Sequence, residues 1–180
     1  MDNLLAKIPI TCQKVLLISA DRQANKALSE LMARLALRGT VVILDGGNSF
    51  DAYLVARSIR RLSVELEEAM DRLRLARAFT CYQMLELLAQ TEATPDPKIV
   101  LDLLTTFRDD APNLGERMRI LRGCLDHLER LSSLAPVLIS IRPPRPGQAE
   151  DQVSFDLVRE AAEHVLLFQE QLPAPQLRLF

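Results

Sequence analysis

Short apolar runs alternate with longer amphipathic stretches along this chain. Continuous apolar runs predict strands that are buried on both faces, at 14–18, 40–44, 98–104, 136–141 and 165–168. Leucines and alanines at helical spacing predict the intervening helices, at 22–37, 81–89, 113–131 and 155–162. This alternation indicates right-handed crossovers and a mainly parallel sheet with helices on both faces, which is a three-layer α/β fold.

Other segments carry weaker patterns. Residues 50–62 and 64–73 have helical composition, and 73–78 fits either a short strand or a continuing helix. The linker 142–147 is rich in proline and cannot form a helix or a central strand. Residues 176–180 could add an edge strand.

Length and composition narrow the possibilities. A chain of 180 residues with 48% hydrophobic content can bury one core and is too short for two ordinary domains, so we expect a single domain over 1–180. The net charge of -2 gives no global attraction to nucleic acid or anionic lipid. No apolar run approaches the length of a membrane span, and no leader pattern is present, so we expect no membrane partner and a cytoplasmic location.

The cysteines and histidines suggest no metal site. Cys12, Cys81 and Cys124 are widely spaced and form no C-x-x-C pair, which predicts buried reduced thiols rather than a disulfide framework. His127 and His164 have no partner at metal or catalytic spacing. We therefore expect no metal and no catalytic residue of the nucleophile–base kind.

The segment 20–27 is a near miss of a phosphate-binding loop. It stands between a predicted strand and a predicted helix, the context in which G-x-x-x-x-G-K-[ST] binds phosphate. Only Lys26 of that pattern is present, because Ala20 and Asn25 replace the glycines and Ala27 replaces the hydroxyl that would hold magnesium. Lys26 is either a remnant phosphate contact or a solvated lysine in the first turn of a helix.

Several segments follow one another in an order that goes beyond a generic α/β pattern. They are the loop at 20–27, the strand 39–45, the segment 50–54, the strand 73–78 with its Arg-Ala ending, the strand Ile99-Val100-Leu101-Asp102, and the long helix at 114–131. From about residue 14 to 168 this order resembles the RecA-like ATPase core of bacterial and archaeal recombinases and KaiC-type proteins. The resemblance implies a RecA-like fold, with Asp102 in the place of the magnesium-binding acid.

The chain departs from that family at the positions that bind and hydrolyse ATP. The stretch Asp45-Gly46-Gly47-Asn48 lacks the glutamate that activates water in the family. Lys26, Asp45 and Asp102 remain as a remnant nucleotide site, at most a weak one for ATP and Mg²⁺, so we expect no cofactor. The alternative for Asp102 is a buried or strand-end acid that is retained by hydrogen bonding. The alternative for 45–48 is a turn in which the glycines supply positive φ.

Arginines are the candidate contacts to DNA or a protein partner. Arg57, Arg60 and Arg61 lie on one predicted helix, although nearby glutamates also fit an ordinary solvated face. Arg142 and Arg145 lie in the linker where the resemblance implies a DNA-contacting loop. Apolar residues near the chain end, Leu177, Leu179 and Phe180, favour self-association or a protein partner.

These observations lead to a catalytically inactive RecA-like binding protein, acting as an accessory factor in DNA repair or recombination through protein contacts, with DNA as a further partner. One alternative is a regulator similar to the SulA-like cell-division inhibitors, which share the architecture without a phosphate loop. A third is a weak ATPase that uses Lys26, Asp102 and the loop at Asp45.

Overall fold

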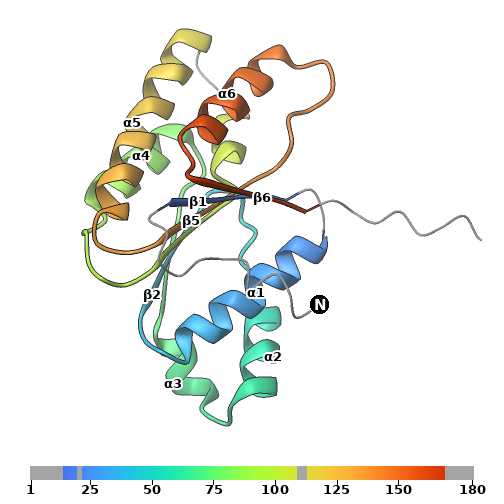
Figure 1. Ribbon diagram of the computed structural model, residues 1–180, viewed down its shortest axis with the longest axis vertical. Coiled ribbons are helices and arrows are strands. Elements are labelled where there is room, and N and C mark those ends of the chain that lie inside the picture. Colours follow the sequence, from blue (N-terminus) through green and yellow to red (C-terminus); the bar gives the residue numbers. More distant parts are fainter. Residues whose placement is uncertain (1–13, 20–21, 109–112, 169–180) are drawn as a thin grey trace, which may run out of the picture.

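The computed structural model describes residues 14–19, 22–108 and 113–168 (Figure 1). The elements in chain order are β1 (Lys14–Ser19), α1 (Arg22–Ala36), β2 (Val41–Asp45), α2 (Ala52–Leu62), α3 (Leu66–Asp71), β3 (Leu73–Arg77), α4 (Cys81–Gln90), β4 (Lys98–Leu101), the 3₁₀ helix η2 (Leu103–Phe107), α5 (Leu114–Ser132), β5 (Val137–Ile141), α6 (Ala149–Glu160) and β6 (His164–Phe168). Strands and helices alternate as the sequence predicts.

Six strands form one sheet in the order β3-β2-β4-β5-β1-β6, and every pair is parallel. All six strands therefore end at the same edge of the sheet, which we call the carboxyl edge. The central strands β4 and β5 are buried along their whole length. Continuous apolar sequence is what burial on both faces requires, which is why these strands were readable from the sequence.

Helices cover both faces of the sheet and make it the middle of three layers. α1, α2 and α3 lie on one face, and α4, α5 and α6 lie on the other (Figure 1). Two apolar clusters follow this division: one contains Met32, Val55 and Ile59, and the other contains Met84 and Leu121. The expected three-layer α/β fold with helices on both faces is confirmed.

Two predicted boundaries were wrong, and each has a local cause. The strand predicted at 98–104 ends at Leu101, because Asp102 adopts a φ of 51° and the chain turns into η2. The last helix begins at Ala149, ahead of its predicted start at 155. The prediction missed its first turns because their buried side chains, Asp151 and Ser154, are polar. The ambiguous segment 73–78 contains a strand, β3.

Candidate functional site

The carboxyl edge brings together residues that the sequence assigned to one remnant nucleotide site. β2 and β4 are neighbours in the sheet, so the loop after Asp45 lies beside the turn at Asp102. The backbone N–H of Gly46 donates to the carbonyl of Leu101 at 2.8 Å and joins the two strand ends. Open α/β sheets place their ligands beyond the carboxyl ends of the strands, and this loop and turn occupy that position.

Asp45 is fully buried, and its carboxylate is used by its own loop. Oδ1 accepts hydrogen bonds from the backbone N–H groups of Gly47 at 3.2 Å and Ser49 at 3.0 Å. Oδ2 accepts from the N–H of Phe50 at 3.1 Å and lies 3.5 Å from Nε of Arg77. These contacts hold the loop between β2 and α2 in place.

Asp102 is also buried, and it forms an ion pair with Arg142 from the end of β5. Its Oδ2 accepts from Nε of Arg142 at 3.0 Å and from Nη2 at 2.5 Å. Its backbone N–H donates to the hydroxyl of Ser140 at 2.9 Å. A guanidinium thus lies against the carboxylate that, by the resemblance, would face magnesium.

Gly46 and Gly47 are needed for space and not for backbone conformation. Neither glycine has a positive φ, so the expectation that they supply one was wrong; that conformation belongs to Asn48, at 49°. A Cβ on Gly47 would collide with the side chain of Asp102. The absent side chains allow the loop after β2 to lie directly against the end of β4.

Lys26 lies in α1 with an exposed side chain. No hydrogen bond or ion pair joins it to Asp45 or Asp102. Ala20 and Asp21, at the start of the near-miss loop, are outside the described residues. The structure therefore brings Asp45 and Asp102 together without linking Lys26 to either of them.

Comparison with known proteins gives no family for this chain. Neither a scan against models of protein families nor a search of the curated proteins finds a match. Within 14–19, 22–108 and 113–168, no group of three or more His, Cys, Asp or Glu side chains could hold a metal ion. None of the described helices is long and apolar enough to cross a membrane.

A second charged cluster lies next to this edge, around the buried carboxylate of Asp151 in α6. Nε of Arg145 donates to it at 2.8 Å, and the guanidinium groups of Arg108 and Arg117 lie 3.8 Å away. Burial opposes ionisation of Asp151, but the hydrogen bond and charge of Arg145 and the charge of Arg108 outweigh it, so the pKa lies below its ordinary value. This cluster attaches the 142–147 loop and α6 to the rest of the domain.

Sequence reasoning missed this cluster because its members lie in four separate segments. Arg108 follows η2, Arg117 is in α5, Arg145 is in the loop and Asp151 is in α6. Arg108 also donates to the carbonyl oxygen of Pro143 at 2.9 Å. The sequence showed only that arginines lie in and near the 142–147 loop. That pattern does not indicate which acidic residue they contact.

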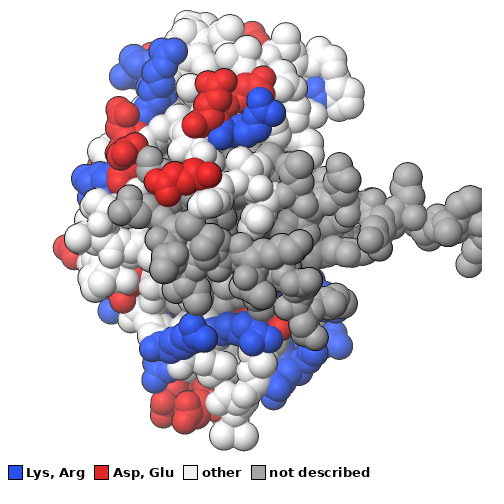
Figure 2. All heavy atoms as spheres, in the orientation of Figure 1, with Lys and Arg blue, Asp and Glu red and all other residues white. Residues whose placement is uncertain are grey.

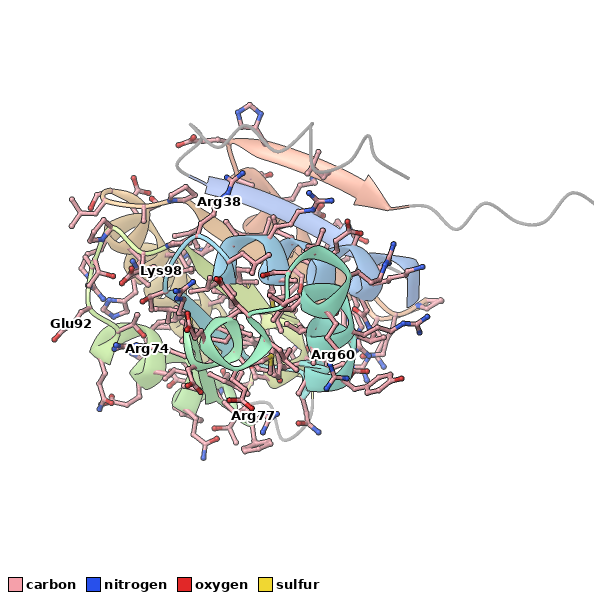
Figure 3. The ribbon with its side chains drawn as sticks, turned by 90° about the horizontal axis from the view of Figure 1, so that it is seen from below. Arg38, Arg60, Arg74, Arg77, Glu92 and Lys98 are labelled. Carbon is pink, nitrogen blue, oxygen red and sulfur yellow. The ribbon has the colours of Figure 1, made fainter. Side chains whose placement is uncertain are left out.

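The five arginines proposed as DNA or partner contacts fall into two groups. Arg142 and Arg145 are engaged by Asp102 and Asp151, so buried acids offset their charge. The other three are exposed on α2 and have no ion pair within the described part of the chain: Arg57, Arg60 and Arg61. Figure 3 shows Arg60 on this helix. Only this second group offers uncompensated positive charge to a partner.

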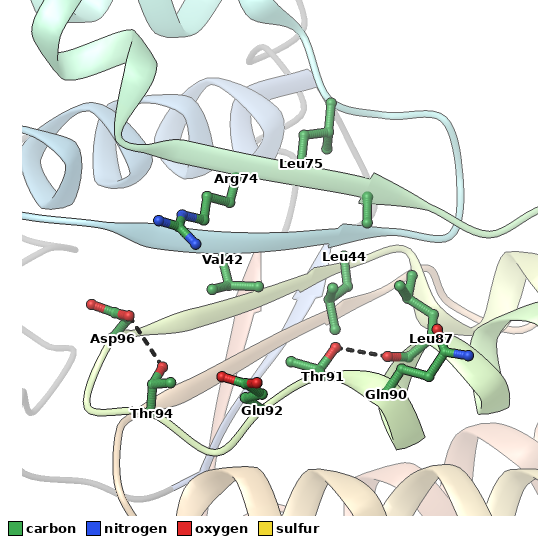
Figure 4. A pocket seen from close by; sticks show the side chains of 11 residues that line it. Val42, Leu44, Arg74, Leu75, Leu87, Gln90, Thr91, Glu92, Thr94 and Asp96 are labelled. Atoms are coloured by element: carbon green, nitrogen blue, oxygen red, sulfur yellow. Dashed lines mark hydrogen bonds between the residues drawn. The ribbon is translucent and has the colours of Figure 1, made fainter.

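A groove of about 440 Å³ lies beside the edge strand β3, and none of the site residues predicted from sequence lines it (Figure 4). Its floor includes Val42, Leu44 and Ala76, and its polar rim includes Arg74 and Glu92. No sequence pattern indicated this groove, because its lining comes from β2, β3, the end of α4 and the loop that follows.

Lys98 and the cysteines are buried titratable groups. Nζ of Lys98 donates to the carbonyl oxygens of Thr94 at 2.6 Å and Asp96 at 2.8 Å, and burial lowers its pKa. Cys81 and Cys124 are free thiols, as predicted, and burial raises the pKa of Cys124 to about 12. Cys12 lies outside the described residues. Lys98, Cys81 and Cys124 are thus buried in the core, and backbone carbonyls satisfy the ammonium of Lys98.

Proposed function

We propose that this chain is a non-catalytic RecA-like protein that acts as an accessory factor in DNA repair or recombination, through contacts with other proteins. The observation that carries the proposal is the ion pair between Arg142 and Asp102. A magnesium ion needs carboxylate oxygens free to bind it, and Oδ2 of Asp102 already accepts two hydrogen bonds from a guanidinium. The ion pair therefore competes with metal binding at this acid, which supports a site that does not hydrolyse ATP.

The loop at Asp45 supports the same proposal. Phosphate binding uses backbone N–H groups that point at the ligand. The N–H groups of Gly47, Ser49 and Phe50 are directed to the carboxylate of Asp45 instead. A protein that retains the architecture without an open phosphate site is expected to act through its surface.

Nucleotide titration tests the absence of a catalytic site. Isothermal calorimetry with ATP and Mg²⁺, at protein concentrations that detect a dissociation constant near ~1 mM, is expected to give no binding heat. Binding together with magnesium-dependent turnover that Lys26→Ala abolishes would overturn the proposal in favour of a weak ATPase.

The accessory role needs a separate test. The chain is expected to capture a recombinase from an extract of its own cells. Retardation of single- or double-stranded DNA at low salt would identify DNA as a further partner. Capture of a tubulin-like division protein, with no effect on DNA, would favour the SulA-like alternative. If neither a recombinase nor DNA is bound, the repair role is wrong.

A further inference from the structure

The turn between α2 and α3 separates two surfaces of opposite charge. The basic patch consists of the exposed residues Arg57, Arg60 and Arg61. The acidic patch consists of the exposed residues Glu65, Glu67 and Glu68. Figure 2 shows basic side chains over α2 and acidic side chains over α3, with uncharged atoms between them.

The uncharged part between the patches is an apolar tip formed by Leu62 and Val64. Val64 is 98% exposed and Leu62 is 41% exposed. They belong to the end of α2 and to the turn that follows it, and this turn projects at the border of the molecule (Figure 1). Exposed apolar residues framed by charges are the composition expected of a protein interface.

The backbone keeps the two patches from neutralising each other within one chain. In a continuous helix, Arg61 and Glu65 would lie one turn apart and could pair. Ser63 instead adopts an extended conformation, with φ of -155° and ψ of 162°, and ends α2. Among the described residues no ion pair joins the two patches; Glu68 pairs with Arg72, and Glu65 and Glu67 with no basic group.

We propose that this surface binds a second copy of the chain in a two-fold symmetric dimer. A two-fold interface uses the same surface on both partners, so each contact occurs twice. The order basic patch, apolar tip, acidic patch is complementary to itself when one copy is rotated by half a turn. Each basic patch then faces the acidic patch of the other copy, and the two apolar tips meet near the axis.

Charge complementarity favours a second copy over other occupants. A nucleic acid would contact the basic patch but would be repelled by the acidic patch next to it. A strongly acidic protein would leave the acidic patch uncompensated in the same way. A second copy compensates both patches and covers the apolar tip, and this argument does not depend on the role in DNA repair.

Sedimentation of the full chain at low and high salt tests the dimer. The chain is expected to sediment as a dimer that weakens as salt screens the facing patches. Val64→Asp is expected to weaken the dimer at least tenfold without loss of fold, because Val64 is almost entirely exposed in the single chain. Sedimentation as a monomer at about 1 mM protein would overturn the proposal.

Charge reversal gives a sharper test. A basic-reversed variant, Arg60→Glu with Arg61→Glu, carries two acidic patches, and an acid-reversed variant, Glu65→Arg with Glu67→Arg, carries two basic ones. Each is expected to be monomeric alone, and an equimolar mixture of the two is expected to form a heterodimer. Arg122→Glu, an exposed reversal on α5, is the control and should leave the wild-type dimer intact.

Two outcomes of the reversal experiment would overturn the dimer. One is a dimer that persists in both reversed variants, which would place the interface elsewhere. The other is an unchanged oligomeric state combined with loss of DNA retardation in the basic-reversed variant, which would make the basic patch a nucleic-acid surface. Far-UV circular dichroism of each variant shows whether a change in sedimentation comes from unfolding.

Discussion

Arg142 and Asp102 form a hydrogen-bonded ion pair that links the ends of the neighbouring strands β5 and β4. The aspartate is buried and the arginine is about half exposed, at 48% of its side chain. From sequence, these residues belonged to two different hypotheses, a nucleotide remnant and a DNA-contacting loop. Their pairing connects both hypotheses, because a single contact occupies the acid and offsets the charge of the arginine.

Removal of Arg142 is expected to destabilise the protein, because it leaves the buried carboxylate of Asp102 without its cation. Arg142→Ala should lower the free energy of unfolding by about 1–2 kcal/mol, a value reduced from that of a fully buried pair because the guanidinium is partly solvated. Urea unfolding of Arg142→Ala, Asp102→Asn and the double variant measures the coupling between the two residues. Additive effects of the two substitutions would contradict the pairing.

Asp45 is expected to stabilise the loop and to contribute nothing to nucleotide binding. Asp45→Ala removes the acceptor of three backbone N–H groups and should cost about 2–3 kcal/mol of unfolding free energy. Asp45→Asn retains one oxygen acceptor and should cost less. Chemical denaturation checks the stability, and calorimetry with ATP should give the same result for wild type and Asp45→Asn. A difference in ATP binding between them would restore the nucleotide role.

The strands were predictable because burial on both faces of a parallel sheet demands continuous apolar sequence. This held for β4 and β5, whose residues are all buried. The first turns of α6 were missed because polar residues occupy buried positions there, and hydrophobic periodicity does not register Asp151 as part of a core. Leu103 and Leu104 caused the opposite error. They are apolar and were assigned to the strand at 98–104, but they belong to η2.

The nearness of Asp45 and Asp102 was predictable from the sequence, but their contacts were not, and no hydrogen bond or ion pair joins Lys26 to them. Strand-end acids follow from the alternation of elements, so Asp45 and Asp102 could be placed at one edge. Their partners could not be predicted, because Arg77 and Arg142 reach them from strands far away in sequence. The apolar side chains near residue 180, from which self-association was predicted, lie outside the described residues, so that prediction stays a prediction.

Acid is expected to weaken the protein through Asp151. Its pKa is below the ordinary value in the folded state, so near pH 4 the unfolded chain binds more protons than the folded one. The stabilisation from this group is complete above the unfolded pKa of about 3.9, and it is lost as the pH falls through the folded pKa. Thermal or urea unfolding between pH 7 and pH 2 should show this decline.

Asp151→Asn is the variant that isolates this contribution. It should be less stable than wild type at pH 7, because three arginines lose their shared carboxylate. The difference in stability between the two proteins should shrink as the pH falls below about 4, because the carboxylate is protonated first in the unfolded wild type and then, at lower pH, in the folded protein. If the two stability curves stay parallel over this range, Asp151 is not the group responsible.

Close packing of Gly47 against Asp102 is expected to make this glycine intolerant of any side chain. A Cβ at position 47 would overlap the Asp102 side chain, whose position is set by Arg142, so Gly47→Ala should cost about 1–3 kcal/mol of unfolding free energy. Gly39→Ala is a matched control, because a Cβ there meets no atom within 4 Å and the residue does not have a positive φ. It should change stability by less than about 0.5 kcal/mol. Equal stability of the two variants in urea would show that the loop after β2 does not lie against the end of β4 as described.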